Sequence, residues 1–240
     1  MSLNNIRRLI LKIILLWFFF PSAIADVDKI YHPYVEVDTY EFETRIISLL
    51  DRDLAAKFSI YRLGFGKELA ENLFVEFYLI DARDTTEKFE VEACEVEACE
   101  VEALYQYTEQ GEYWLDFGIL LEIERERDSQ EWEGNIGFLF EKEFGKWSAS
   151  LNIHNQYLYE DDVAHKWELS QTIQWRYRYS PGFEPAVEIY SDSDDFFIGP
   201  VILGQVGLDD SKLNWEVGIV TELNHSSNES VLRVLVEREF

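Results

Sequence analysis

The chain ends on the stretch Ser230-Val231-Leu232-Arg233-Val234-Leu235-Val236-Glu237-Arg238-Glu239-Phe240. Most of its even positions are apolar, namely Leu232, Val234, Val236 and Phe240, while its odd positions include Arg233, Glu237 and Glu239. Successive side chains of a β-strand lie on opposite faces, so this alternation predicts a strand with one apolar and one mostly polar face. A strand at the very end of a chain needs a pairing partner, and we therefore expect it to close a sheet.

The same alternation recurs along the chain, in segments separated by turn residues. It predicts strands at residues 34–48, 55–65, 73–79, 100–107, 113–123, 132–144, 147–159, 167–179, 183–189, 198–208, 215–223 and 230–240. Residues 55–65 alternate poorly and residues 198–208 are apolar on both faces, whereas the other strands carry carboxylates or amides opposite their apolar face. The prediction is an all-β, up-and-down antiparallel transmembrane β-barrel of about twelve strands.

The connections between these segments alternate in kind. One set is tight, at residues 66–72, 108–111, 145–146, 180–182 and 209–212. The other set is mostly more acidic or polar, at residues 49–53, 81–88, 128–130, 160–165, 191–197 and 224–229. Because an even number of strands puts both ends of the chain on one side, we expect the termini to lie beside the tight turns, as in barrels with periplasmic turns and extracellular loops.

The N-terminus predicts a cleaved signal peptide over residues 1–25. Arg7 and Arg8 precede a run that is apolar except for Lys12, and Ala23 and Ala25 form a small-residue cleavage pattern before Asp26. The uninterrupted apolar run, residues 13–20, is shorter than the ~20 residues that a membrane-spanning helix needs. The expected mature chain, residues 26–240, is a single barrel domain.

Charge excludes some classes of partner. The chain has 21 Lys and Arg against 47 Asp and Glu. Removal of Arg7, Arg8 and Lys12 with the signal peptide leaves 18 − 47 = −29. Such a surface repels the phosphates of nucleic acid. Aromatic residues make up 15% of the chain, a proportion that suits the aromatic girdles of a membrane barrel with a polar interior.

The last strand resembles the closing strand of bacterial outer-membrane β-barrels, which typically ends in an aromatic residue with apolar residues at alternate positions before it. Phe240, Val236, Val234 and Leu232 match that pattern, whereas Arg238 stands where an apolar residue is usual. The resemblance implies an outer-membrane location, contact with lipid and lipopolysaccharide, and Phe240 as an assembly signal for the barrel-assembly machinery. The alternative is a soluble periplasmic β-barrel or sandwich that binds a ligand.

The inward-facing positions supply the candidate site residues. The predicted lumen-lining residues are Glu102, Asp116, Glu122, Glu133, Glu141, His154, Arg176, Arg178, Glu188 and Arg233. Carboxylates gather on the fourth to sixth strands and bases stand elsewhere. An acid-lined pore repels anions, so the sequence favours a narrow channel for small cationic or neutral solutes. The alternative is a structural or adhesion barrel whose lumen is closed by salt bridges.

No catalytic, cofactor or metal site is predicted. Outer-membrane phospholipases use a Ser/His/Asn site, but here His154 and Asn155 fall on opposite faces, the Gly-Arg that follows His-x-Asn in that family is missing, and no serine is placed to pair with them. We therefore expect a protein that is not an enzyme. No Cys/His spacing fits a metal.

A five-residue repeat, Glu-Val-Glu-Ala-Cys, begins at Glu90 and contains Cys94 and Cys99. An odd period turns the glutamates of each copy to the opposite face. We expect only the last copy to lie in the barrel wall, with Val101, Ala103, Tyr105 and Tyr107 outward. The two cysteines, roughly 17 Å apart in an extended strand, are expected to stay unpaired.

Overall fold

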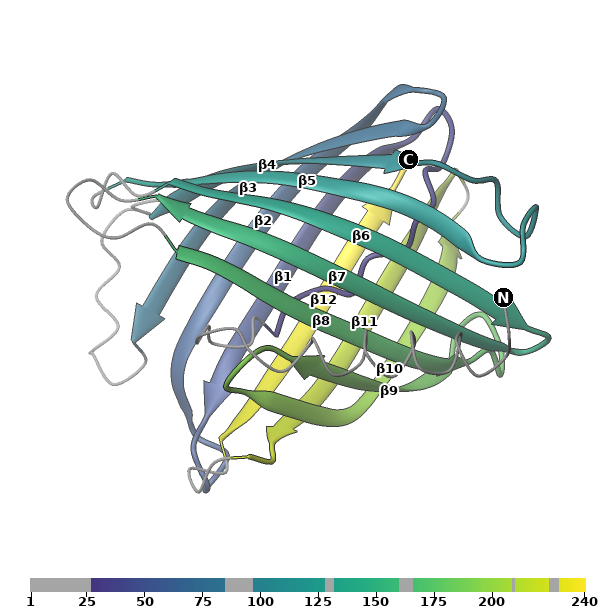
Figure 1. Cartoon of the computed structure of the whole chain (residues 1–240). Coiled ribbons are helices and arrows are strands. Elements are labelled where there is room, and N and C mark those ends of the chain that lie inside the picture. Colours follow the sequence, from purple (N-terminus) through teal and green to yellow (C-terminus); the bar gives the residue numbers. More distant parts are fainter. Residues whose placement is uncertain (1–26, 85–96, 128–131, 160–165, 209, 225–228) are drawn as a thin grey trace, which may run out of the picture.

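The fold is a closed barrel of twelve antiparallel strands in a computed structural model, which describes residues 27–84, 97–127, 132–159, 166–208, 210–224 and 229–240 (Figure 1). The strands are β1 (Tyr40–Leu50), β2 (Ala56–Ala70), β3 (Leu73–Asp84), β4 (Ala98–Gln106), β5 (Asp116–Glu126), β6 (Trp132–Phe144), β7 (Trp147–Tyr159), β8 (Lys166–Tyr177), β9 (Glu184–Ser191), β10 (Phe196–Leu208), β11 (Ser211–Glu222) and β12 (Ser230–Glu239). Each strand pairs with its neighbours in sequence, and β12 pairs with β1. The predicted fold class is confirmed.

The closing pair joins the two ends of the described chain. Thr44 lies opposite Val236 and Ile47 opposite Arg233 in the β1–β12 register. Beyond the last residue of β12, the backbone NH of Phe240 donates to the carbonyl of Tyr40 at 2.9 Å, and the Tyr40 NH donates to the Phe240 carbonyl at 3.0 Å. The two rings stack with centroids 6.1 Å apart. The last strand therefore closes the barrel, as its alternation predicts.

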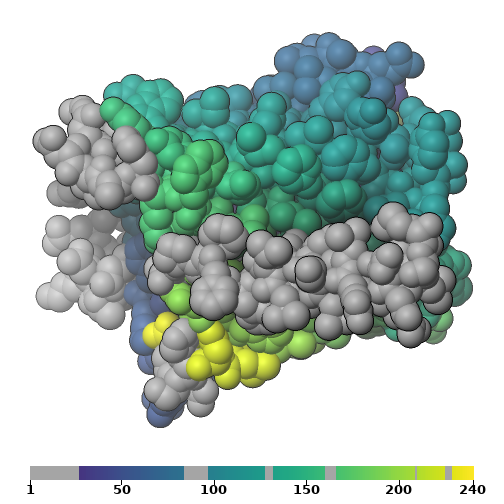
Figure 2. Space-filling model, viewed as in Figure 1, coloured from purple at the N-terminus to yellow at the C-terminus, as the bar shows by residue number. Residues whose placement is uncertain are grey.

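The outer face of the barrel is apolar. Exposed large side chains stand on it at alternate positions of neighbouring strands, and they include Phe42, Phe65, Phe77, Val101, Leu121, Ile136, Trp175 and Val236. The strands coloured teal to green pack side by side over one side of the molecule (Figure 2). Exposed aromatics also stand at strand ends, among them Trp147, Trp167 and Phe144. This distribution matches the lipid-facing band and aromatic girdles of a membrane barrel.

No helix in the described ranges is long and apolar enough to cross a membrane. The residues predicted as a signal peptide, including Ala23 and Ala25, lie outside the described part of the chain. Their role stays a prediction.

Several strand boundaries differ from those predicted. The first strand begins at Tyr40 instead of residue 34, β2 runs on to Ala70 and shortens the turn expected at residues 66–72, β3 extends to Asp84, and β5 begins only at Asp116. At Gly64 and Gly66 the missing side chains leave room for inward-facing aromatic rings. A Cβ on Gly64 would lie 2.5 Å from Cε1 of Tyr78. A Cβ on Gly66 would collide with the ring of Phe74, so Gly66 reflects close packing inside a strand and not a turn.

The last copy of the repeat lies in the barrel wall as expected, but the wall begins earlier, because β4 starts at Ala98 in the second copy. In β4, Glu100 and Glu102 are buried, whereas Val101 and Tyr105 are exposed on the outer face. Tyr107 follows the end of the strand and is exposed as well. Cys99 is a free, exposed cysteine. Cys94 and the first copy lie outside the described residues.

Candidate functional site

The lumen of the barrel contains a stretch of the chain's own N-terminal part. Residues 27–39, here called the inner segment, precede β1 and form no strand. Val27, Ile30 and Tyr31 are buried although no strand carries them. The purple trace of these residues runs inside the ring of strands in Figure 1. The predicted first strand, residues 34–48, is therefore wrong in its first part.

The buried end of the inner segment is held by apolar packing. Val27 and Ile30 join a cluster with the inward-facing residues Ile47, Tyr190, Phe197, Val220 and Val231. Most of these residues stand near the loop ends of β1, β9, β10, β11 and β12. Because the transfer of apolar side chains out of water lowers the free energy, this cluster anchors the segment well inside the barrel.

Asp28 connects the segment to two arginines of the barrel wall. Its carboxylate forms an ion pair with Arg45 and lies 3.3 Å from Nη1 of Arg62. Burial alone raises the pKa of this carboxyl, but the two guanidinium groups outweigh burial and hold the pKa well below its usual value. The Asp28 carbonyl also accepts hydrogen bonds from Arg233 and, at 2.8 Å, from the hydroxyl of Tyr190.

Lys29 points the other way, into a group of carboxylates. Its Nζ lies 2.7 Å from Oε2 of Glu43, 3.3 Å from Oε2 of Glu237 and 3.8 Å from Oε1 of Glu41. Burial lowers the pKa of the ammonium group, yet these carboxylates raise it well above the usual value. Asp28 and Lys29 together make the segment complementary to both charge types in the lumen.

Three further side chains of the segment contact the acidic side of the lumen. The Tyr31 hydroxyl donates to Glu102 at 2.7 Å, and the Tyr34 hydroxyl donates to Asp116 at 2.8 Å. Between them, Nδ1 of His32 lies 2.6 Å from Oε2 of Glu141. Main-chain contact follows, because the NH of Val35 donates to Gln106 at 2.7 Å. The segment is thus hydrogen-bonded along its length.

All ten predicted lumen-lining residues lie on the inner side of the wall. Glu102, Asp116, Glu141, Glu188 and Arg233 are buried, and the other five, Glu122, Glu133, His154, Arg176 and Arg178, are partly buried. The structure does not separate them into an acidic wall and a basic wall. Each arginine instead lies beside carboxylates of neighbouring strands.

Arg233 shows this local pairing most clearly. Its Nη2 lies 2.9 Å from both carboxylate oxygens of Glu188 and 3.0 Å from Oε2 of Glu216. Arg178 lies 2.7 Å from Glu143 and 3.6 Å from Glu141. The geometry is that of charge-assisted hydrogen bonds, most of which reach across the lumen over one or more intervening strands, and they fix side chains there.

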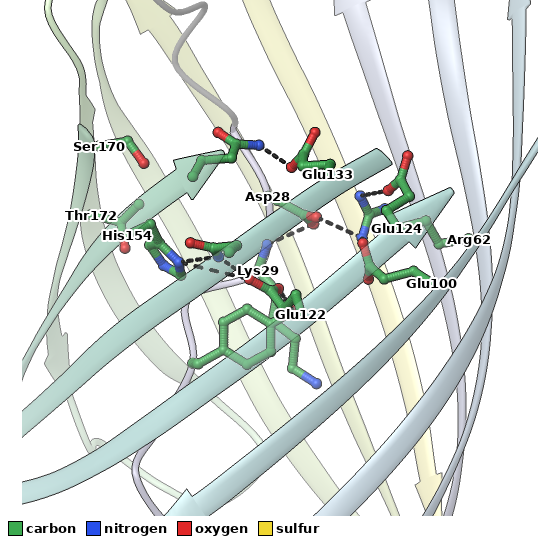
Figure 3. Close-up of a pocket in the computed structure, with 13 residues that line it drawn as sticks. Asp28, Lys29, Arg62, Glu100, Glu122, Glu124, Glu133, His154, Ser170 and Thr172 are labelled. Carbon is green, nitrogen blue, oxygen red and sulfur yellow. Dashed lines mark hydrogen bonds and ion pairs between the residues drawn. The ribbon is translucent and has the colours of Figure 1, made fainter. Parts of the chain in front are cut away.

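Glu122, Glu133 and His154 line a small cavity of about 50 Å³ (Figure 3), whereas Arg176 lines a larger one. Asn135 donates to Glu122 and lies 2.8 Å from Nδ1 of His154. Glu133 accepts a hydrogen bond from Gln156 on the neighbouring strand. Arg62, which was not predicted, links Glu100 at 3.1 Å with Glu124 at 3.8 Å.

A second and larger cavity of about 730 Å³ lies on the other side of the inner segment. It is lined by Glu36 and Thr39, by Gln205 and by Glu239, residues near the end of the barrel where the short turns and both ends of the sheet meet. Lys29 and Tyr31 line both cavities. The inner segment therefore divides the lumen.

Sequence reasoning missed the inner segment, and with it Asp28 and Lys29. One signal was present. Pro33 cannot donate to a strand ladder, which argues against a continuous strand through residues 30–36. The alternating pattern of the predicted strand becomes regular only from Tyr40 onward. Nothing in the sequence, however, places residues 27–39 inside the barrel.

No protein-family model matches the chain, and no curated protein sequence matches it. Solved structures do match. The COG4313 outer membrane channel from Pseudomonas putida F1 has a TM-score of 0.57 at 13% identity, covering 91% of this chain and 100% of its own. The fold is that of the outer-membrane β-barrels.

Two porins match over similar lengths. The KdgM porin, solved in complex with disordered oligogalacturonate, has a TM-score of 0.55 at 13% identity and covers 82% of this chain and 97% of its own. The NanC porin has a TM-score of 0.53 at 8% identity, with 81% and 98% covered. At these identities the likeness concerns the fold.

Proposed function

We propose that this protein is an outer-membrane channel for small cationic or neutral solutes, and that the inner segment holds its lumen closed. The observation that carries the proposal is the division of an acid-rich lumen by a segment bound through charge pairs. Among the described residues, ten carboxyl side chains are buried, compared with two arginine side chains. The buried acids are Glu43, Glu76, Glu100, Glu102, Asp116, Glu141, Glu168, Glu188, Glu222 and Glu239.

The negative charge of the residues that line the lumen favours cations over anions as solutes. A narrow passage lined by carboxylates lowers the energy of a cation inside it and raises that of an anion. The oligogalacturonate bound by the KdgM porin is an acidic sugar, and an acid-rich lumen suits such a ligand poorly. The fold likeness therefore does not carry that ligand over to this chain.

The location follows from the outer surface. Strands of 8 to 15 residues with an apolar outer face fit a bilayer, where a β-strand needs about 9–11 residues to span the hydrocarbon. We include insertion through the barrel-assembly machinery and contact with lipopolysaccharide in the proposal. The folded protein is expected to partition into membranes and to change its gel mobility on heating, whereas a soluble barrel would do neither.

The test is conductance in planar bilayers. Wild-type protein is expected to show rare current steps, because the inner segment closes the lumen most of the time. A variant with Asp28 and Tyr31 both replaced by alanine loses the ties to Arg45, Arg62 and Glu102, so it is expected to conduct more often. Absence of current in both proteins, at every voltage, would overturn the channel.

The second candidate is a structural or adhesion barrel with a permanently closed lumen. The dense ion pairing around Glu141 and Arg233 favours it, since salt bridges fill part of the cross-section. The bilayer experiment separates the two functions, because a structural barrel stays silent even after the inner segment has lost its ties.

A further inference from the structure

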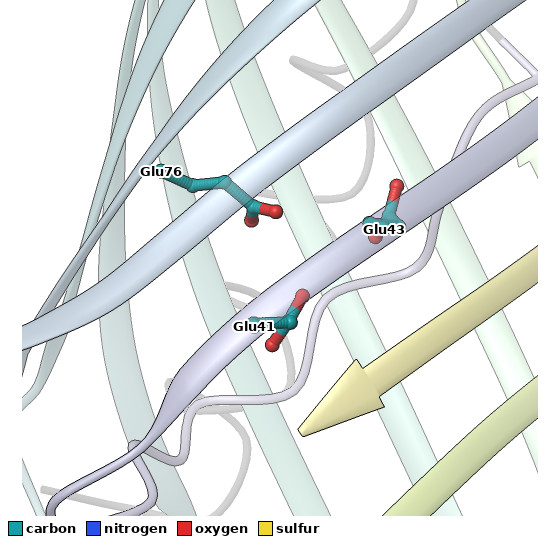
Figure 4. Close-up of side chains that lie close together, drawn as sticks. All are labelled: Glu41, Glu43 and Glu76. Atoms are coloured by element: carbon teal, nitrogen blue, oxygen red, sulfur yellow. The ribbon is translucent and has the colours of Figure 1, made fainter. Parts of the chain in front are cut away.

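A carboxylate cage lies on the inner wall where β1, β3 and β12 meet the inner segment. Glu41, Glu43 and Glu76 stand close together, with carboxylate oxygens within 4.8 Å of one another (Figure 4). Glu237 of β12 joins them through Lys29. Three of these four residues, Glu41, Glu76 and Glu237, line the cavity of about 730 Å³.

The occupant of the cage is an ammonium group that the barrel itself does not supply. Nζ of Lys29 lies 2.7 Å from Glu43 and 3.3 Å from Glu237, and it stands 5.6 Å from the centroid of the Tyr31 ring. An ammonium group has three donors, and an aromatic face within about 6 Å adds a cation–π contact. The cage therefore has the geometry of a primary-amine site with a tethered amine in it.

The wall residues are prepared for a cation independently of Lys29. One oxygen of Glu43 accepts hydrogen bonds from Arg45 at 2.6 and 2.9 Å, which aims the other oxygen at the ammonium group. Asn214 donates to Glu237 at 2.7 Å and holds that carboxylate in the same way. Such supporting contacts are what keep a binding site in its productive geometry.

Glu76 gives a second, separate sign of a ligand. Its side chain is 4% exposed, and its Oε1 has no hydrogen-bond partner among the described residues. Figure 4 shows its carboxylate extending from β3 toward Glu41 and Glu43. A buried carboxylate oxygen without a donor is costly, and an ammonium group that is not tethered to the chain is free to turn one of its three donors toward it.

Resting on the proposed channel function, we propose that this cage is the binding site for the primary ammonium group of a small solute, and that Lys29 occupies it as a tethered competitor. The solute class is a small amine with an apolar stem like that of lysine. The adjoining cavity has a volume typical of small-molecule sites, about 300–1,000 Å³. Binding of the amine displaces Lys29 and loosens the inner segment.

The test uses the full chain, folded in detergent, with n-propylammonium as the probe, since this ion matches the atoms removed by Lys29→Ala. Isothermal titration calorimetry is run on wild type, Lys29→Ala and Lys29→Arg. Removal of a tethered competitor is expected to tighten binding of the probe by at least ~10-fold in Lys29→Ala. Lys29→Arg keeps a cation in the cage and is expected to bind the probe as weakly as wild type.

Matched controls separate the cage from the general charge of the lumen. Lys57 forms an exposed pair with Glu229 outside the lumen, so Lys57→Ala is expected to leave probe binding at the wild-type level. The double variant Lys29→Ala/Glu76→Gln keeps the shape of the cage but removes one charge. It is expected to lose most of the increase in probe affinity that Lys29→Ala alone shows. Heat-modifiable gel mobility shows that each variant is folded.

Two results would overturn the cage as an amine site. One is probe binding in Lys29→Ala that is no tighter than in wild type. The other is equal binding of tetramethylammonium, which carries the same charge without donors. Either result leaves the channel untouched if the bilayer current persists. Conversely, tight probe binding in a protein that never conducts supports the cage as an amine site and rules out the proposed channel function.

Discussion

Nη2 of Arg233 lies 2.9 Å from both carboxylate oxygens of Glu188, and both residues are almost completely buried. Arg233 belongs to the closing strand β12 and Glu188 to β9, so the bond crosses the lumen over two intervening strands. Its Nη1 also reaches the carbonyl of Asp28 in the inner segment. One side chain thus links the wall and the inner segment.

Replacement of this arginine is expected to destabilise the barrel. Arg233→Leu leaves Glu188 and Glu216 buried without their cation, and removing one partner of a buried pair costs about 3–5 kcal/mol. Urea unfolding of the refolded barrel, followed by tryptophan fluorescence, measures the change in the free energy of unfolding. Arg238→Ala, at an exposed site on the outer face, is the control and is expected to change it by less than about 0.5 kcal/mol.

The inner segment is expected to open when its central ion pairs are removed. Asp28→Ala deletes the carboxylate that contacts Arg45 and Arg62. A loss of one to two kcal/mol in docking would raise the ratio of open to closed states roughly 5- to 30-fold. Single-channel open probability measures this ratio. An unchanged open probability would show that the segment does not close the lumen.

Low pH is also expected to raise the open probability, because it protonates Asp28. Because the pKa of Asp28 is held below its ordinary value in the docked state, the stabilisation is fully present above that ordinary value of 3.8 and is lost as the pH falls below it. Open probability of wild type should therefore rise below about pH 4. Asp28→Asn cannot titrate, so the pH-dependent difference between the two proteins should vanish at low pH.

Phe240→Ala is expected to lower assembly into the outer membrane several-fold. The reason is that the last strand resembles the closing strand of outer-membrane β-barrels, which implies that Phe240 acts as an assembly signal. Its ring also stacks on Tyr40 across the closing pair. The amount of folded barrel in isolated outer membranes measures assembly. Phe144→Ala, an exposed aromatic at the end of β6, serves as control and should assemble normally. Equal assembly of both variants would contradict the role of Phe240.

The barrel itself could be predicted from alternation, because most strands have an apolar outer face and a polar inner face. Leu232, Val234 and Val236 face outward, and Arg233 and Glu237 face the lumen, as the sequence pattern predicts. Predicted strand boundaries were wrong where a residue typical of turns is needed for close packing inside a strand, as at Gly66. The residues predicted to line the lumen follow from the period of two alone.

The contacts of the candidate site could not be predicted in the same way. Lys29 and Glu237 are 208 positions apart, and only closure of the barrel brings them within 3.3 Å. Arg62 belongs to a strand whose alternation is poor, so its inward direction was hidden. The inner segment has no periodic pattern, and its place is set by burial of Val27 and Ile30 and by charge pairs with the wall.

The sign of the current shows whether the lumen, once freed of its inner segment, is a path for cations. The measurement is the reversal potential of the Asp28→Ala variant in a planar bilayer with a gradient of potassium chloride. An acid-rich lumen freed of its inner segment predicts a reversal potential near the equilibrium potential of potassium, which means selectivity for the cation. A reversal potential on the chloride side, or no current at any voltage, would contradict the account.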